Sequence, residues 1–69
     1  MLEGKPDLPR APANRGTILS VRGSVIDARF DSRLPAINNI LRAGDHAQIL
    51  IEVWAQLDPH RVRADRVWA

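Results

Sequence analysis

The most regular pattern in the sequence is an alternation of apolar and polar positions over residues 47–57. The apolar set on one face is Ile49, Ile51, Val53, Ala55 and Leu57. The apolar stripe of a helix would recur every three or four residues, whereas these positions recur every second residue. The segment therefore predicts a long β-strand with one face turned toward a core.

Four shorter segments also favour strands, because they are rich in β-branched residues or alternate in the same way. They are residues 17–22, 24–30, 40–42 and 62–68. In the second of them, Ile26, Ala28 and Phe30 share one face of the predicted strand. In the last, Val62, Ala64 and Trp68 share one face, which Arg66 interrupts.

Short turn signals separate these strands. Gly23 predicts a bulge or a sharp bend between the first two, and Asp58-Pro59-His60 predicts a turn before the last. No stretch is long and periodic enough for a helix that could cover a sheet. The fold class expected is all-β, a small closed or partly open β-barrel of about five to six short antiparallel strands.

Residues 1–15 have a different character from the rest of the chain. They contain Pro6, Pro9 and Pro12, and a proline has no N–H to donate to a strand ladder. We therefore expect residues 1–15 to be a disordered, Pro-rich arm and residues 16–69 to form the β-barrel domain.

Size and composition make a partner the expected source of extra stability. A chain of 69 residues buries only about 60% of the surface that its unfolded form exposes. It has no cysteine, so neither a disulfide nor a thiolate metal site is available. His46 and His60 stand apart in the sequence and do not form a ligand-spaced cluster.

The sequence contains no motif for catalysis or phosphate binding. A P-loop needs a lysine after a glycine-rich turn, but Lys5 is the only lysine and Pro6 follows it. Asp27 and Glu52 fall on polar strand faces, where a solvated or salt-bridged role is far commoner than catalysis. We therefore predict no catalytic, cofactor-binding or metal-binding residues in this segment.

Nucleic-acid binding is the alternative from another functional class, since small barrels bind single strands through basic grooves and aromatic platforms. Its basic residues would be Arg22, Arg29, Arg61, Arg63 and Arg66. Trp54 and Trp68 are the aromatic side chains that could stack on bases, although Trp54 could equally anchor a protein interface. The net charge of only +2 disfavours nucleic acid as a partner.

The order of the predicted elements resembles one family. Residues 16–30, GTILSVRGSVIDARF, resemble the opening of F-type ATP synthase β subunits, G-x-I-x-x-V-x-G-x-V-V-D-V-x-F. Residues 34–41, LPAINNIL, are similar to that family's L-P-x-I-x-N-A-L, and residues 50–53, LIEV, to its L-x-L-E-V strand. Gln56-Leu57 and Val62-Arg63 fit its later Q-H-L and V-R. The resemblance is therefore to the family's N-terminal β-barrel domain.

The sequence departs from the family pattern after Arg63, because Asp65 stands where an apolar residue is usual. Residues 52–58 are closer to a variant β subunit, like that of the alternative, sodium-type bacterial ATPases. The family's sixth barrel strand and nucleotide-binding domain are expected to be absent from residues 16–69. We accordingly expect an unpaired edge that makes the free domain self-associate or fray near residues 61–69.

The resemblance implies a role in assembly. In the family, the N-terminal barrels of alternating α and β subunits form a ring, or crown, that holds the hexamer together, and ATP and Mg are bound elsewhere in the subunit. The segment would thus support ATP synthesis or hydrolysis coupled to ion transport without catalysing it, although it resembles part of a catalytic subunit. Its expected partners are neighbouring α and β subunits. Its expected location is the cytoplasmic face of the membrane, as a peripheral part of a membrane-bound complex without direct insertion.

Overall fold

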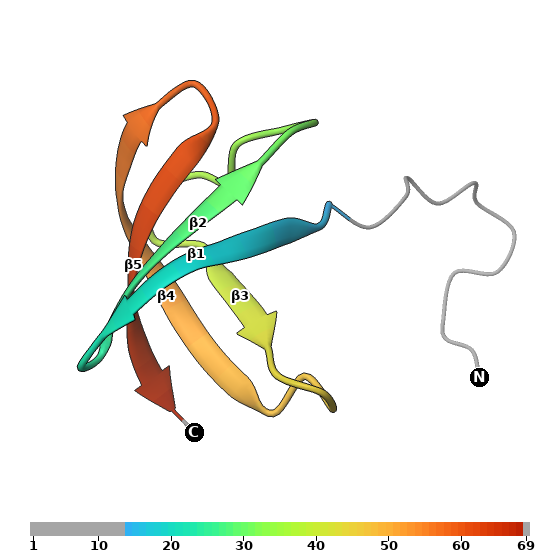
Figure 1. The fold of residues 1–69 in the computed structure, drawn as a ribbon, viewed down its shortest axis with the longest axis vertical. Helices are drawn as coiled ribbons and strands as arrows, with labels where there is room; N and C mark the ends of the chain where they lie inside the picture. The colour runs from blue at the N-terminus through green and yellow to red at the C-terminus, as the bar shows by residue number, and fades with distance from the viewer. Residues whose placement is uncertain (1–13, 69) are drawn as a thin grey trace, which may run out of the picture.

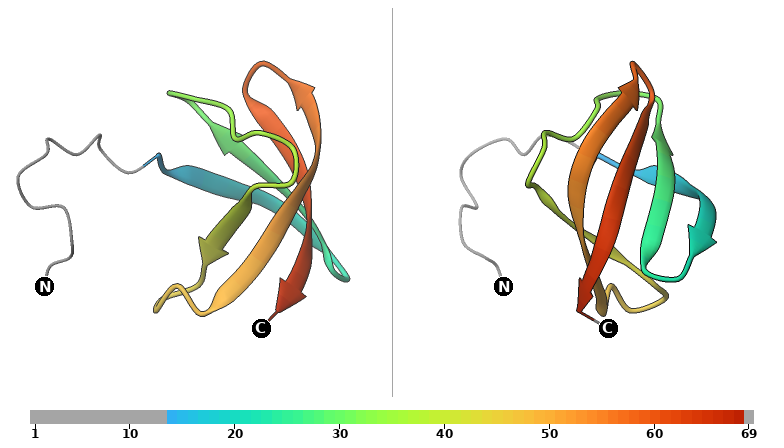
Figure 2. Two further views of the ribbon diagram at one scale, coloured as in Figure 1. Left: turned by 180° about the vertical axis from the view of Figure 1, so that it is seen from behind. Right: turned by 90° about the vertical axis from the view of Figure 1, so that its left-hand side faces the viewer.

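The computed structural model describes residues 14–68, which form a single curled sheet of five strands (Figure 1). The strands are β1 (Gly16–Arg22), β2 (Val25–Phe30), β3 (Ile40–Ala43), β4 (Ile49–Asp58) and β5 (Arg61–Trp68). Each predicted strand is present, with ends displaced by one or two residues. The all-β prediction is confirmed, and of the two forms expected it is the partly open barrel that is found (Figure 2).

The strand order is β1-β2-β5-β4-β3, and every neighbouring pair is antiparallel. Two-residue turns join β1 to β2 and β4 to β5. Gly23 begins the first turn with a φ of 61°, which a residue with a Cβ adopts only with strain. The predicted bend at Gly23 is therefore a hairpin turn.

The core lies on the concave face of the sheet, where alternate residues of three strands meet. Its buried side chains are Ile26, Ala28 and Phe30 of β2, Ile51 and Val53 of β4, and Val62 and Ala64 of β5. Leu34 and Leu41 are partly buried and pack against this core. The face predicted for the second strand is confirmed residue by residue.

Alternation along β4 holds only as far as Val53. β-Bulges shift the β4–β5 register between Val53 and Ala55 and again between Gln56 and Asp58. As a result Leu57, which we placed on the core face, is 37% exposed. Beyond the shift between Val53 and Ala55, Gln56 Nε2 donates a hydrogen bond to the Pro35 carbonyl at 2.9 Å. The alternation prediction was wrong for this end of the strand.

The position of the unpaired edges also differs from expectation. We expected a free edge near residues 61–69, but β5 is the central strand and pairs with β2 on one side and β4 on the other. The free edges are β1 and β3. Of the predicted arm, only Asn14 and Arg15 lie among the described residues, so residues 1–13 are outside them.

Candidate interaction surfaces

On the convex face of the sheet, Asp27 of β2 forms ion pairs with two arginines, Arg63 and Arg22. Arg63 lies directly opposite on β5 and donates two hydrogen bonds to this carboxylate, from Nε at 2.8 Å and Nη2 at 3.0 Å. Arg22 Nη2 is 4.0 Å from the same carboxylate. The hydrogen bond from Arg63, with smaller coulombic contributions, holds the pKa of Asp27 below its ordinary value. Asp27 is therefore a structural carboxylate, held ionised rather than poised to give up a proton.

A second carboxyl with a lowered pKa is that of Asp58, the last residue of β4 before the turn to β5. Arg61 Nε donates to Asp58 Oδ2 at 2.6 Å, and the His60 backbone N–H donates to Asp58 Oδ1 at 2.8 Å. These two bonds, that from Arg61 above all, lower the pKa of Asp58. The side chain thus closes the turn that the sequence predicted at this place.

The lowered pKa values of Asp27 and Asp58 predict how the stability of the domain falls at acid pH. Because the pKa of each is lower in the folded chain than the ordinary 3.8, their contribution is complete well above pH 3.8. It is lost as the pH falls below that value. Asp27→Asn should lower the Tm at pH 6 and flatten its fall between about pH 4 and pH 2, and Asp58→Asn should add to the flattening. The measurement is Tm against pH; an unchanged acid limb in the double variant would contradict the assignment.

The other polar side chains that could have served catalysis or metal binding either form structural hydrogen bonds or lie apart from one another. Ser24 Oγ donates to Asp65 Oδ1 at 2.6 Å across the end of the sheet. His46 and His60 lie in the connections at opposite ends of β4, so they do not meet. Within residues 14–68 there is no group of three or more His, Asp or Glu side chains placed to hold a metal ion.

The predicted basic cluster is largely paired with acids. Besides the Arg63–Asp27 and Arg61–Asp58 pairs, Arg29 Nε lies 2.8 Å from Asp31 Oδ1. A phosphate backbone needs positive charge that is free to replace counterions. These pairs make the cluster a poor phosphate-binding surface, which disfavours the nucleic-acid alternative.

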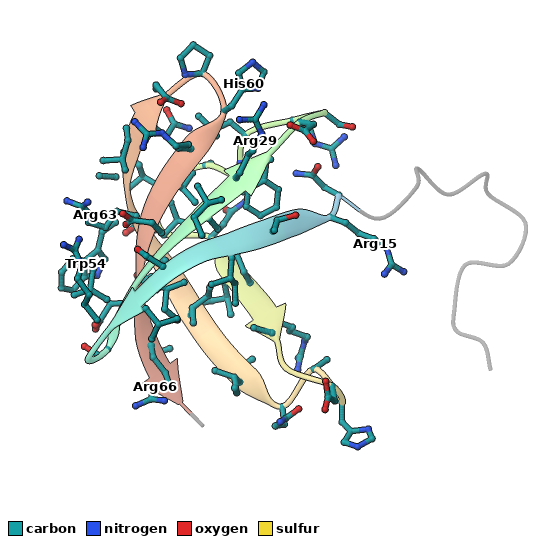
Figure 3. The ribbon with its side chains drawn as sticks, viewed as in Figure 1. Arg15, Arg29, Trp54, His60, Arg63 and Arg66 are labelled. Carbon is teal, nitrogen blue, oxygen red and sulfur yellow. The ribbon has the colours of Figure 1, made fainter. Side chains whose placement is uncertain are left out.

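Trp54 is a large exposed side chain on the convex face of the part of the chain that the structure describes. It is 54% exposed and lies at the β4 bulge, beside Arg63 of the next strand (Figure 3). Half-exposed tryptophan next to arginine is the composition of interface hot spots rather than of an isolated surface. The side chain of Trp68 lies outside the part of the chain that the structure describes, so its predicted ability to stack on bases stays a prediction.

Other large apolar side chains are also exposed on this small domain. They are Ile18, Leu19, Val21, Ile37, Ile40, Leu57 and Val67. Ile18, Leu19 and Val21 all belong to the edge strand β1. Exposed apolar residues gathered along one edge favour a surface that contacts a partner.

A hollow of about 300 Å³ lies between the two edge strands. Its lining residues are Asn14, Arg15, Gly16, Thr17, Ile18, Ala28, Phe30, Leu41, Arg42, Ala43 and Ile51. Sequence reasoning missed this site, because residues 14–18 and 41–43 are brought together only by the curl of the sheet. No motif in the sequence marks it.

Comparison with known proteins identifies the family. The chain is 51% identical over 57 residues, 83% of its length, to ATP synthase subunit beta 2 of Shewanella frigidimarina. It is 56% identical over 54 residues to the subunit of the same name from Albidiferax ferrireducens, and 55% identical over 49 residues to that of Polaromonas naphthalenivorans. The chain is homologous to the N-terminal portion of ATP synthase β subunits.

The homology covers a small part of each relative. The matched region is 83%, 78% and 71% of this chain, but only 12%, 10% and 10% of the three ATP synthase β subunits. No family model matches the chain, and no solved structure matches it significantly. The resemblance predicted from residues 16–63 is confirmed by these relatives.

Among residues 14–68, no helix is long and apolar enough to cross a bilayer.

Proposed function

We propose that this chain acts as an assembly domain in the headpiece of a rotary ATP synthase. It packs beside the N-terminal barrels of neighbouring α and β subunits in a ring, and it carries out no reaction itself. The observation that supports this role is the 51–56% identity to the N-terminal portion of three ATP synthase β subunits. The complex that contains it is a peripheral headpiece at the cytoplasmic face of a membrane, and its chemistry serves ATP synthesis or hydrolysis coupled to ion transport.

The surface of the domain suits this role. A chain of this size has a small core, and contact with neighbours adds stability by mass action. Trp54 supplies an aromatic anchor on the convex face, and Ile18 and Val21 supply apolar edge contacts. Meanwhile Asp27 and Asp58 are engaged with arginines, so they do not offer free acids for proton transfer.

A chimaera tests the proposal. The matched N-terminal segment of the S. frigidimarina β subunit is replaced by this sequence, and the subunit is co-expressed with its own partner subunits. We expect the hexameric headpiece to form and to retain ATP hydrolysis. Trp54→Ala in the chimaera should weaken assembly by roughly tenfold or more, as expected for a hot-spot residue. Val67→Ala, at a side chain 48% exposed, is the matched control and should assemble normally.

The proposal fails if the chimaera folds but does not enter the complex. It fails equally if the isolated 69-residue chain binds ATP by itself with micromolar, magnesium-dependent affinity in calorimetry. Steeply salt-sensitive binding of the isolated chain to a labelled single-stranded oligonucleotide, lost in Trp54→Ala, would favour the nucleic-acid alternative instead.

A further inference from the structure

A row of paired residues crosses the convex face of the sheet. Each lies directly opposite the next, and from β3 to β1 they are Ile40, Glu52, Asp65, Val25 and Arg22. Glu52 lies between Ile51 and Val53, which are buried on the concave face, so the row belongs to the convex face. Side chains directly opposite each other have Cβ atoms about 4.5–5.5 Å apart. The carboxylates of Glu52 and Asp65 are therefore neighbours across the β4–β5 pair.

These two carboxylates have no cationic partner within residues 14–68. Neither Glu52 nor Asp65 forms a salt bridge there, although both are half-buried. In the neighbouring row, by contrast, Asp27 lies opposite Arg63 and pairs with it. Like charges directly opposite each other on antiparallel strands are destabilising. The Glu52–Asp65 pair therefore lowers the stability of the free domain, and a cation supplied from outside would remove that repulsion.

Exposed apolar side chains adjoin this acidic pair. Ile40 is 52% exposed and lies opposite Glu52 on β3. Trp54 is 54% exposed and follows Glu52 by two residues along β4 (Figure 3). The face of a tryptophan ring attracts a guanidinium group, and tryptophan is enriched at protein interface hot spots. The convex face thus combines unpaired negative charge with an aromatic surface, and this combination favours an arginine side chain.

We propose that Glu52, Asp65 and Trp54 form a binding site for an arginine side chain on the surface of a neighbouring subunit. The guanidinium group donates hydrogen bonds to the two carboxylates and packs against the Trp54 ring. An apolar residue beside that arginine covers Ile40. The inference rests on the proposed function, because it names the chemistry of one contact in the assembly. The contact is specific, since a neutral or acidic side chain would leave the two carboxylates unpaired.

An arginine of a partner fits this site better than the other cations do. Ca²⁺ takes about six to eight oxygen ligands, but residues 14–68 contain no group of three or more His, Asp or Glu side chains placed to hold a metal ion. Lysine has a compact, strongly hydrated ammonium group, whereas the planar guanidinium of arginine can donate to two carboxylates and stack on an indole ring. In a second copy of this chain, Arg61 and Arg63 are already paired with acids.

The first test is the stability of the isolated 69-residue chain. Glu52→Gln should raise the midpoint of urea unfolding by roughly 0.2–0.5 M, because it removes the repulsion and keeps the shape of the side chain. Asp45→Asn removes an equal charge from the connection between β3 and β4. It is the matched control and should leave the midpoint unchanged. An unchanged or lower midpoint in Glu52→Gln would overturn the proposal, since the two carboxylates would then not repel each other.

The second test is an NMR titration of the ¹⁵N-labelled chain with a capped leucine-arginine-leucine peptide. We expect shifts of the Trp54 indole N–H and of the amides of Glu52 and Asp65. Glu52→Gln should weaken binding by roughly twofold to fivefold, the range for an exposed ion pair. The same peptide with citrulline, which has the shape of arginine without its charge, should bind more weakly by a similar factor. Asp45→Asn should leave the affinity unchanged.

Several results of the titration would overturn the proposal. One is the absence of shifts at Trp54 up to peptide concentrations of roughly 10 mM. Another is equal affinity for the arginine and citrulline peptides, since the carboxylates would then play no part. If calcium chloride shifts these signals and the peptide does not, the pair is a cation site; if the signals shift with the concentration of the chain alone, the surface joins two copies. Because the titration uses the isolated chain, its failure leaves the chimaera result untouched.

Discussion

Val62→Asp should unfold the isolated domain at room temperature. Val62 is 0% exposed and lies at the centre of the sheet, where β5 pairs with β2 and β4. Removing one partner of a buried ion pair, which leaves a charge unpaired in an apolar site, costs about 3–5 kcal/mol. The whole free energy of unfolding of a domain this small is itself about 3–5 kcal/mol. The substitution therefore removes essentially all of the stability.

Far-UV circular dichroism and the dispersion of the ¹H–¹⁵N spectrum would measure this loss. The matched control is Val67→Asp, the same change on the same strand at a side chain 48% exposed. It should keep the dispersed spectrum and shift the urea midpoint only slightly. A folded Val62→Asp variant, or an unfolded Val67→Asp one, would show that the core is not where the structure places it.

Phe30→Ala is expected to have the second largest effect, a loss of about 3–5 kcal/mol in the free energy of unfolding. Phe30 is 5% exposed and lines the hollow between β1 and β3. It packs in one cluster with Ala28, Val53 and Val62. Removing the ring leaves a cavity in the cluster that it shares with Ala28, Val53 and Val62, so these side chains lose their contacts with it. Phe30→Leu, which keeps part of the volume, should cost about 1–2 kcal/mol and remain measurable by urea denaturation.

Gly16 provides an independent check on the position of the Phe30 ring. A Cβ at Gly16 would lie 2.6 Å from Phe30 Cζ and 2.7 Å from the Arg29 carbonyl oxygen. Gly16→Ala should therefore destabilise the domain by about 1–3 kcal/mol. In a Phe30→Leu background the clash with Cζ disappears, so the penalty should shrink, with a coupling of about 0.5 kcal/mol or more. Strict additivity of the two substitutions would mean that ring and glycine are not in contact.

The local sequence was sufficient to predict the strands and most of the core. Ile26, Ala28 and Phe30 are buried as predicted, because a period of two sends them all to one side of a strand, whatever lies beyond it. Gly23 and Pro59 mark turns because the backbone angles they favour are needed there. The prediction that Leu57 faces the core was wrong, because β-bulges shift the β4–β5 register before this residue. A β-bulge depends on how two strands pair, so the apolar and polar alternation of one strand does not predict it.

The candidate surfaces were much less predictable. Asp27 was expected to be solvated or salt-bridged, but its partner Arg63 lies 36 residues away, and only the β2–β5 pairing brings the two together. The arginines of the predicted basic cluster lie on β1, β2 and β5, but most of their charge is neutralised by ion pairs with Asp31, Asp58 and Asp27. Spacing along a chain cannot show such pairs, because the charges meet across strands.

By itself, the sequence determined that this chain is an all-β domain, where its strands lie and that it is related to ATP synthase β subunits. These properties depend on residue order and on a periodicity that each strand carries locally. Only the tertiary structure decided that β5 is central, that β1 and β3 are the free edges, and that an apolar hollow with arginines at its rim separates them. Strand order depends on which long-range pairings bury the most apolar surface together, and no single segment contains that information.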